Sequence, residues 1–380
     1  MRTVLVGLAA LAVAAAAGCQ AADEDRSEGA PVLVGEDKAD GTGVEVAGWL
    51  KPSAPVASDI AAPQRLGFVF YASAGAVVDI EVTRTGSAPG LDTVLRVHGP
   101  RGADGSYRTT VGEDQDAGYG KLSLLRRLKL TSEGFYLAEV ALGADPGGAK
   151  AFRLELRCGS GTCVSDKPVV VPGYEVRWTE RSAEMRALAR QAYQVAGARL
   201  DAMRATLPAR WGVVLDIDET VLSNLTYQRE RAELGLGYSS PSWLAWVKRR
   251  AATAMPGATE YLGKVRALGG KIVFVTNRKA DGECAPTEAN LAAVGLVYDA
   301  ILCRTDASDK NARFESVAAG SARAALPALS IVQFVGDNIQ DFPGLGQELR
   351  KAPAADFADF GGRFLLVPNP MYGSWEKNPD

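Results

Sequence analysis

The order of apolar and polar residues divides this 380-residue chain into regions of different character. From about residue 44 to 158 the two kinds alternate, as in VVDIEV at 77–82 and FRLELR at 152–157. A period of two is typical of strands with one buried face. Because several such runs are separated by turns rich in Gly and Asp, the pattern predicts a small all-β sandwich domain at 44–164.

A different pattern begins near residue 165 and continues to residue 380. Helical segments separate short apolar runs at 211–215, 271–275, 299–302, 331–335 and 363–367. The first expected helix, 181–203, carries an apolar side made of Met185, Leu188, Ala192, Val195 and Met203. Short apolar strands alternating with helices predict an α/β domain, in which a parallel sheet is covered on both faces.

The N-terminal segment has the composition of an export signal. Residues 1–18 contain a 15-residue apolar run, too short for a comfortable membrane span. The end of this segment, AAGC, resembles a bacterial lipoprotein cleavage box. Acylation of Cys19 would anchor the protein to the outer membrane; the alternative is ordinary secretion, with Cys19 incidental or removed. Residues 19–43 are acidic and predict a flexible tether.

Charge and histidine content exclude several kinds of function. The formal net charge is −3, which argues against nucleic acid as the main partner. The chain has one histidine, His98, so mechanisms that need paired histidines are excluded. We expect His98 to be a surface or core residue.

Export would place the remaining cysteines in an oxidising compartment. Cys158 and Cys163 belong to the short sequence CGSGTC, and we expect them to form a disulfide. Cys284 and Cys303 flank one helix-to-strand unit, and the sequence leaves open whether they pair or remain two thiols.

Polar residues follow the predicted strands of the α/β region. In such sheets ligands bind at the carboxyl ends of the strands. The residues found there are Asp216, Asp218, Thr276, Asn277, Arg278, Lys310, Asp337 and Asp341. A carboxylate such as Asp216 can attack phosphorus to form an acyl-phosphate, and Asp218 can protonate the leaving alkoxide and later deprotonate water. Mg²⁺ would offset the repulsion between Asp216 and the phosphate.

This order of residues resembles the haloacid dehalogenase (HAD) superfamily, and within it the class C acid phosphatases, the outer-membrane lipoprotein e family of 5′-nucleotidases. One family signature is matched by VLDIDETVL at 214–222 followed by Asn224 and Tyr227. The second is matched by GDNIQDF at 336–342, with Ile in place of Leu. The resemblance covers residues 175–376. It implies an HAD-type Rossmann-like sheet with a helical cap.

The resemblance also implies a ligand set for Mg²⁺. Asp216, the backbone carbonyl of Asp218 and Asp337 would be ligands, and Asp341 would hold the metal's water shell or support Asp337. Thr276 and Lys310 would bind the phosphoryl oxygens.

Asn277 and Arg278, which follow Thr276, are expected to bind substrate.

The segment 223–270 is too long for a simple crossover and is expected to form the cap. By the resemblance, Trp243 and Tyr372 would lie on the two faces of a nucleobase, an arrangement that tolerates any base. The alternative for Trp243 is packing of the cap helix with Trp246, since residues three apart share a helix face. For Trp246 we expect packing.

Together these features predict an exported, Mg²⁺-dependent phosphomonoesterase acting on nucleoside 5′-monophosphates, with nicotinamide mononucleotide as a further candidate. One alternative is a broad-specificity acid phosphatase. Another is a surface-binding lipoprotein in which the β-sandwich binds an unknown ligand and the HAD domain is a scaffold.

The β region resembles the pre-peptidase C-terminal modules of secreted bacterial proteases. Its acidic segment 113–116 is either a solvated turn, which we favour, or a calcium site. Since every candidate site residue lies beyond residue 210, we expect residues 20–160 to be dispensable for catalysis.

Overall fold

The computed structural model describes residues 43–379 except 53, 87, 161–163 and 166–169. The expected export signal, most of the tether, Cys19 and Cys163 therefore lie outside the described residues, as does the predicted Cys158–Cys163 pairing. Within the described part of the chain, no helix is long and apolar enough to cross a membrane.

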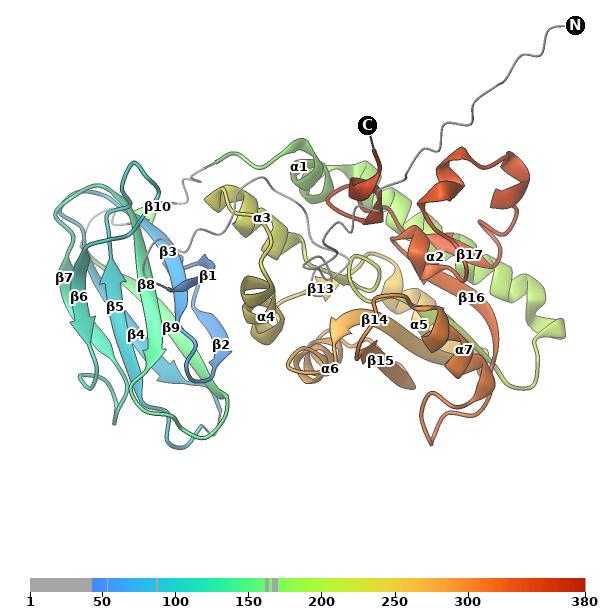
Figure 1. Ribbon diagram of the computed structural model, residues 1–380, viewed down its shortest axis with the longest axis horizontal. Helices are drawn as coiled ribbons and strands as arrows, with labels where there is room; N and C mark the ends of the chain where they lie inside the picture. The colour runs from blue at the N-terminus through green and yellow to red at the C-terminus, as the bar shows by residue number, and fades with distance from the viewer. Residues whose placement is uncertain (1–42, 53, 87, 161–163, 166–169, 380) are drawn as a thin grey trace, which may run out of the picture.

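The N-terminal region is all β, as predicted (Figure 1). One sheet has the strand order β1-β3-β8-β5-β6, with β10 paired to β3, and the other has the order β2-β9-β4-β7. The strands are β1 (Glu45–Trp49), β2 (Val56–Ile60), β3 (Leu66–Ala72), β4 (Val77–Arg84), β5 (Thr93–His98), β6 (Thr110–Asp114), β7 (Leu124–Lys129), β8 (Gly134–Leu142), β9 (Lys150–Ser160) and β10 (Val164–Ser165). Alternate residues of both sheets face a shared core, which includes Phe68, Phe70, Ile80 and Leu154.

The C-terminal region is the predicted α/β fold. Its parallel sheet has the order β15-β14-β11-β16-β17, with β11 (Trp211–Leu215), β14 (Lys271–Lys279), β15 (Ala300–Arg304), β16 (Ser330–Gly336) and β17 (Phe364–Leu366). The helices beyond the β-sandwich are α1 (Tyr174–Arg181), α2 (Ala183–Met203), α3 (Leu225–Leu234), α4 (Ser240–Arg249), α5 (Ala258–Ala267), α6 (Cys284–Ala293) and α7 (Asn311–Ala319). Residues of α2, α5 and α6 share a core with one face of the sheet, and residues of α7 pack against the other.

The expected helix 181–203 is interrupted at its start. Ser182 ends α1, and its hydroxyl accepts a hydrogen bond from the amide of Met185, which caps α2. The buried residues of α2 are Met185, Ala189, Tyr193, Ala196, Gly197 and Leu200. Of the predicted apolar side, Met185 is buried, and Ala192 and Val195 are half-buried and pack against the same core, whereas the prediction was wrong for Leu188. Leu188 is 44% exposed because it lies one position off the i, i+4 row that faces the sheet.

Between β11 and β14 the chain forms β12 (Leu222–Ser223), α3, α4, β13 (Thr253–Ala254) and α5. Figure 1 shows α3 and α4 between the β-sandwich and the parallel sheet, and α4 contacts both β1 and β2. Arg231 of α3 donates to the carbonyl oxygen of Val46 at 2.8 Å, and Arg250 pairs with Asp59 at 3.1 Å. The β-sandwich therefore packs directly on this inserted segment.

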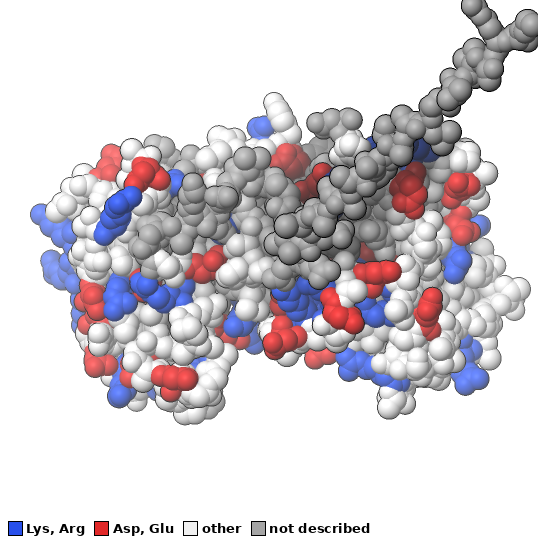
Figure 2. Space-filling model, in the orientation of Figure 1, with Lys and Arg blue, Asp and Glu red and all other residues white. Residues whose placement is uncertain are grey.

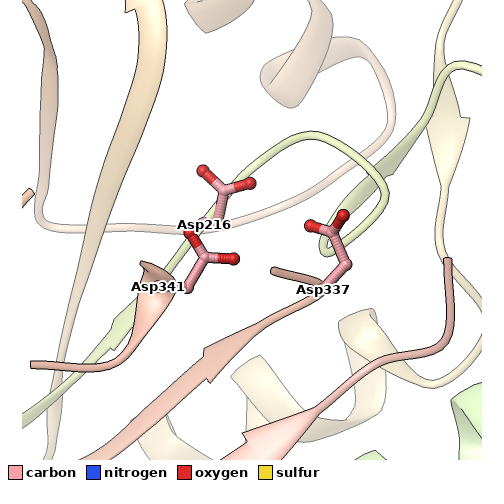
Figure 3. Close-up of side chains that lie close together, drawn as sticks. All are labelled: Asp216, Asp337 and Asp341. Carbon is pink, nitrogen blue, oxygen red and sulfur yellow. The ribbon is translucent and has the colours of Figure 1, made fainter. Parts of the chain in front are cut away.

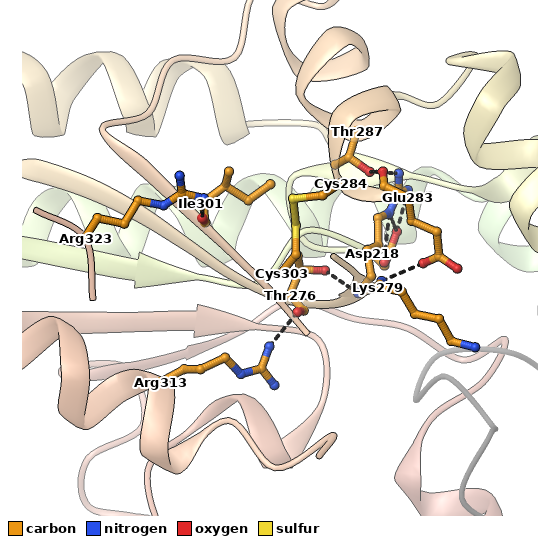
Figure 4. Close-up of a disulfide and its surroundings, with 11 residues drawn as sticks. Asp218, Thr276, Lys279, Glu283, Cys284, Thr287, Ile301, Cys303, Arg313 and Arg323 are labelled. Atoms are coloured by element: carbon orange, nitrogen blue, oxygen red, sulfur yellow. Dashed lines mark hydrogen bonds and ion pairs between the residues drawn. A yellow bond between two sulfur atoms is a disulfide. The ribbon is translucent and has the colours of Figure 1, made fainter. Parts of the chain in front are cut away.

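The structure resolves the question that the sequence left open about Cys284 and Cys303. They form a disulfide that joins the start of α6 to β15 (Figure 4), with their Cα atoms 6.1 Å apart. In the acidic segment 113–116, the carboxylate of Asp114 at the end of β6 accepts hydrogen bonds from the amide of Ala117 and from the amide of Leu124 at the start of β7.

His98 is a buried residue of the β-sandwich. Its Nε2 lies 2.7 Å from the carboxylate of Glu139, which also accepts hydrogen bonds from Arg65 and Arg96. Hydrogen bonds to a carboxylate favour its charged form. Burial opposes the effect, but His98 and Arg65 prevail and lower the pKa of Glu139 to about 2.

Candidate active site

Three carboxylates meet at the carboxyl edge of the parallel sheet. Asp216 directly follows β11, Asp337 directly follows β16, and Asp341 ends the short helix η2 (Ile339–Asp341). One carboxylate oxygen from each lies within 4.8 Å of the other two (Figure 3). The approach of Asp341 requires Gly336, because a Cβ at that position would overlap the Asp341 side chain.

Lys310 is the cation of this cluster. It lies at the start of α7, and its Nζ is 2.6 Å from Asp216 Oδ1 and 2.5 Å from Asp341 Oδ1. Although burial alone would lower the pKa of Lys310, Asp216 and Asp341 raise it. The amine is therefore charged, and it is 4% exposed.

One lysine does not neutralise three carboxylates. Burial raises the pKa of Asp216 to about 7 despite the opposing effect of Lys310, and Asp341 and Asp218 contribute to the increase. Burial, followed by the charges of Asp341 and Asp216, also raises the pKa of Asp337. Because a nearby cation would favour the ionised forms, this cluster of oxygen atoms suits a hard divalent metal.

Hydrogen bonds fix the orientation of Asp337. The hydroxyl of Thr220 donates to Oδ1 and the amide of Asn369 donates to Oδ2, both at 2.9 Å. Neither partner was identified from the sequence. Thr220 lies inside the first signature, which could have pointed to it, whereas Asn369 approaches from the segment after β17.

A tight turn brings Asp218 to the same cavity as Asp216. The carbonyl oxygen of Ile217 accepts from the amides of Val221 and Leu222 at 2.9 and 2.8 Å, and Glu219 adopts a left-handed conformation with φ +51°. If the strand had continued, the Asp218 side chain would face the same side of the sheet as Asp216 and lie two residues further along. The turn instead folds the chain over the carboxyl end of β11.

Arg278 and Asn224 hold the carboxylate of Asp218. Arg278 Nη2 and Nε lie 2.7 and 3.0 Å from Asp218 Oδ1, and the amide of Asn224 donates to the same oxygen at 2.8 Å. The remaining end of Arg278 donates to Thr287 of α6, and the guanidinium lies 5.3 Å from the ring centre of Trp243. Arg278 is 2% exposed. It was expected to bind substrate, whereas in this structure its contacts are with the protein.

The cavity itself is lined by Asp216, Asp218, Asn277, Lys310, Asp337, Asn338, Asp341 and Tyr372. Asn277 accepts a hydrogen bond from Arg313 at 2.6 Å. Thr276 is fully buried beside the cavity, and its hydroxyl accepts from the amide of Arg278 at 3.1 Å. The structure thus brings the sequence-predicted residues of four strand ends together, with Thr276 just outside the lining.

The two aromatic residues expected to bind a base are placed differently. Tyr372 lines the cavity, and its hydroxyl donates to Glu219. Trp243 is 4% exposed and is not a lining residue, because its ring packs edge-on against Tyr227 and carries Arg278 above it. Burial raises the pKa of Glu219 to about 8, helped by the charge of Asp218.

A model of the HAD superfamily, subfamily IIIB (acid phosphatase), matches residues 166–375. The chain belongs to this acid phosphatase family. The matched residues contain every side chain that lines the cavity.

The chain is also similar to individual proteins. The class C acid phosphatase from Bacillus anthracis is 33% identical, with a TM-score of 0.48, over 53% of this chain and 85% of that one. The stem 28 kDa glycoprotein of Glycine max is 31% identical over 162 residues, which are 42% of this chain and 58% of the relative. This chain thus spans little more than half the length of that curated relative. The pre-peptidase C-terminal domain of a Bacillus anthracis collagenase is 12% identical, with a TM-score of 0.23, over 30% of this chain and 96% of that domain.

Proposed function

We propose that the protein is a metal-dependent phosphomonoesterase whose substrates are nucleoside 5′-monophosphates, with nicotinamide mononucleotide as a further candidate. The observation that carries the proposal is the cavity at the carboxyl edge of the sheet. There Asp216, Asp337 and Asp341 converge, Lys310 Nζ contacts Asp216 and Asp341, and Asp218 lies in the same cavity wall. A scaffold without activity would have no need to bury so much negative charge, which is costly unless a ligand compensates it.

Mg²⁺ is the proposed metal. Asp216, Asp337 and the backbone carbonyl of Asp218 would hold it, and Asp341 would support its water shell or Asp337. The residues fit this ion because hard oxygen donors from two loops converge within 4.8 Å, and burial raises the pKa of both Asp216 and Asp337. When bound, Mg²⁺ would neutralise charge on the nucleophile and on the phosphate.

The residues of the chain would act in two steps. Asp216 attacks phosphorus, the bond to the ester oxygen breaks, and Asp218 donates a proton to the departing alkoxide. Asp218 then takes a proton from water, which attacks the aspartyl-phosphate, so that phosphate leaves and Asp216 is regenerated. Lys310 and Thr276 are proposed to bind the phosphoryl oxygens. Asn277, which lines the cavity, is proposed to contact the substrate.

Tyr372 is the proposed contact for the nucleobase; Trp243, which the family resemblance puts on the opposite face of the base, packs on Tyr227 and Arg278 in this structure. Tyr372 is supported by its place in the cavity wall. The second candidate, a broad-specificity acid phosphatase, is favoured by the burial of Trp243 beneath Arg278. A base bound by Tyr372 alone would give weaker selection among phosphate esters.

The experiment compares kcat/KM for AMP, nicotinamide mononucleotide and β-glycerophosphate, each with EDTA and after Mg²⁺ is added back. We expect EDTA to abolish turnover, Mg²⁺ to restore it, and the two nucleotides to be preferred. Equal rates on all three esters would reduce the proposal to the broad phosphatase. Activity that survives thorough chelation would contradict the proposed metal dependence.

We further propose that the protein is exported and anchored to the outer membrane through acylated Cys19, with secretion as the alternative. The sequence of residues 1–19 supports this proposal. Figure 2 shows acidic and basic side chains interspersed on the described part of this face, as the net charge of −3 suggests. Mass spectrometry of the mature N-terminus would detect the lipid. A Cys19→Ser variant that remained membrane-bound would contradict the anchor.

A further inference from the structure

Helix α4 belongs to two hydrophobic cores at once. Ala245 is fully buried in the core cluster of the β-sandwich, together with Ala47 and Val56. The next residue, Trp246, is 1% exposed and belongs to the core cluster of the α/β region. A movement of the β-sandwich relative to the parallel sheet would therefore have to move α4 as well.

A buried ion pair lies at the contact between α4 and β1. Arg249 donates to the carboxylate of Glu230 through two nitrogens, at 2.5 and 2.9 Å, and both side chains are about nine-tenths buried. Gly48 of β1 lies directly against this pair, with φ +152°. A Cβ on Gly48 would overlap the Glu230 carboxylate and come within 2.7 Å of Arg249 Nη1.

From this ion pair, a continuous series of contacts reaches Asp218. The guanidinium of Arg249 lies 5.0 Å from the ring centre of Trp246. The indole N–H of Trp246 donates to Asn224 Oδ1 at 2.8 Å, and Asn224 Nδ2 donates to Asp218 Oδ1 at 2.8 Å. Asn224 is fully buried, and its amide is also held by Arg278 Nη2, which donates to Oδ1 at 3.1 Å, and by Glu219, which accepts from Nδ2 at 2.9 Å. The Trp246 hydrogen bond is the one of these contacts that comes from α4.

We propose that the β-sandwich domain positions the Asp218 carboxylate, with Arg249, Trp246 and Asn224 as the positioning residues. The inference rests on the proposed function, in which Asp218 is the proton donor. It gives the β-sandwich a role in catalysis without any contact between that domain and the substrate. It also reverses the expectation that residues 20–160 are dispensable.

The test changes only the face of the β-sandwich that meets α4. Gly48→Ala places a methyl group against the Arg249–Glu230 pair. The matched control is Gly148→Ala, another positive-φ glycine of the β-sandwich region (φ +101°) at which a Cβ meets no atom within 4 Å. Circular dichroism and melting temperatures of the full-length variants establish that both are folded.

The readout separates proton donation from general damage. kcat/KM is measured on β-glycerophosphate, whose alkoxide must be protonated as it leaves, and on p-nitrophenyl phosphate, whose phenolate leaves with little help. We expect Gly48→Ala to lower kcat/KM at least tenfold on β-glycerophosphate and less than threefold on p-nitrophenyl phosphate. Gly148→Ala should match the wild type on both substrates.

Two results would overturn the inference: unchanged kinetics in a folded Gly48→Ala protein, or equal losses on both esters. If Gly48→Ala does not fold, Arg249→Lys decides instead, because it removes the two-nitrogen contact with Glu230 and leaves β1 intact; it should show the same difference between esters. A wild-type protein that hydrolyses neither ester would refute the proposed function itself, which is a distinguishable outcome.

Discussion

Arg278 contacts the Asp218 carboxylate through two nitrogens, with Nη2 2.7 Å and Nε 3.0 Å from the same oxygen. The pair is enclosed by Trp243 and Thr287, so the guanidinium has little room to turn toward a substrate. Figure 4 shows Thr287 and Asp218 in the surroundings of the Cys284–Cys303 disulfide. The contact gives Arg278 a role in orienting Asp218.

Replacing Arg278 tests that role. Arg278→Met should lower kcat/KM for an alkyl phosphate by about 10²- to 10⁴-fold, the usual contribution of general acid–base catalysis. The kcat/KM of Arg278→Lys should fall between those of the wild type and Arg278→Met, because lysine keeps the positive charge but lacks the planar guanidinium. Steady-state kinetics on purified, folded variants provide the measurement. If Arg278 binds substrate instead, KM should rise while kcat is preserved.

Asp216→Asn should abolish turnover and leave the fold intact. The amide cannot act as the nucleophile and is a poorer metal ligand. Because burial raises the pKa of Asp216, removing its charge should not destabilise the protein. Activity on p-nitrophenyl phosphate and a thermal melt would check both statements, and a variant that retained a substantial part of wild-type turnover would disprove the assigned nucleophile.

Tyr372 and Trp243 should respond differently to substrate size. Tyr372→Ala should weaken transition-state stabilisation for AMP by about 1–3 kcal/mol, the usual scale of base stacking, and matter less for β-glycerophosphate. Tyr372→Phe keeps the ring and serves as the control for the hydroxyl contact with Glu219. Trp243→Ala should lower kcat/KM by the same factor for AMP and for β-glycerophosphate, since the Trp243 ring packs on Arg278. A loss confined to AMP would show that Trp243 stacks on the base.

The Glu139 cluster makes the stability of the β-sandwich depend on pH. The pKa of Glu139 is lowered to about 2 in the folded protein, so the unfolded chain takes up its proton first as the pH falls. The stabilisation is present above the ordinary pKa of a glutamate, about 4.5, and is lost as the pH falls toward 2.

Glu139→Gln should therefore lower the free energy of unfolding by roughly 3 kcal/mol at pH 7, and by progressively less below pH ~4.5. Denaturant titrations of wild type and variant at several pH values would measure the difference. A difference that stayed constant from pH 7 to pH 3 would exclude the ion pairs as its cause.

The sequence predicted those parts of the site that depend on local pattern. Each strand of the parallel sheet is a short apolar run, and the residues after it must lie at one edge, so Asp216, Lys310 and Asp337 were found without coordinates. The partners of Asp218 were not found. They depend on how α3, α4 and α6 pack on one another, which no spacing along the chain specifies.

Long-range contacts escaped the sequence for the same reason. Gly48 and Arg249 are far apart in the chain, and nothing near either residue indicates that they meet. Pairing of Cys284 with Cys303 was left open because it depends on the direction in which α6 returns to β15. The most buried row of α2 lies one position away from the predicted row, because the many alanines of this helix are compatible with both its buried and its exposed face.

The two cores that meet in α4 also limit how the chain can be divided. If the β-sandwich were cut away, Ala245 would lose its neighbours in that domain's core, and Leu234, which packs with Val44, Trp49 and Leu137, would lose its own. Newly exposed apolar side chains on one surface promote self-association. A phosphatase fragment made by proteolysis or truncation should therefore be prone to aggregate. The solubility of the α/β region thus depends on the β-sandwich that covers these side chains.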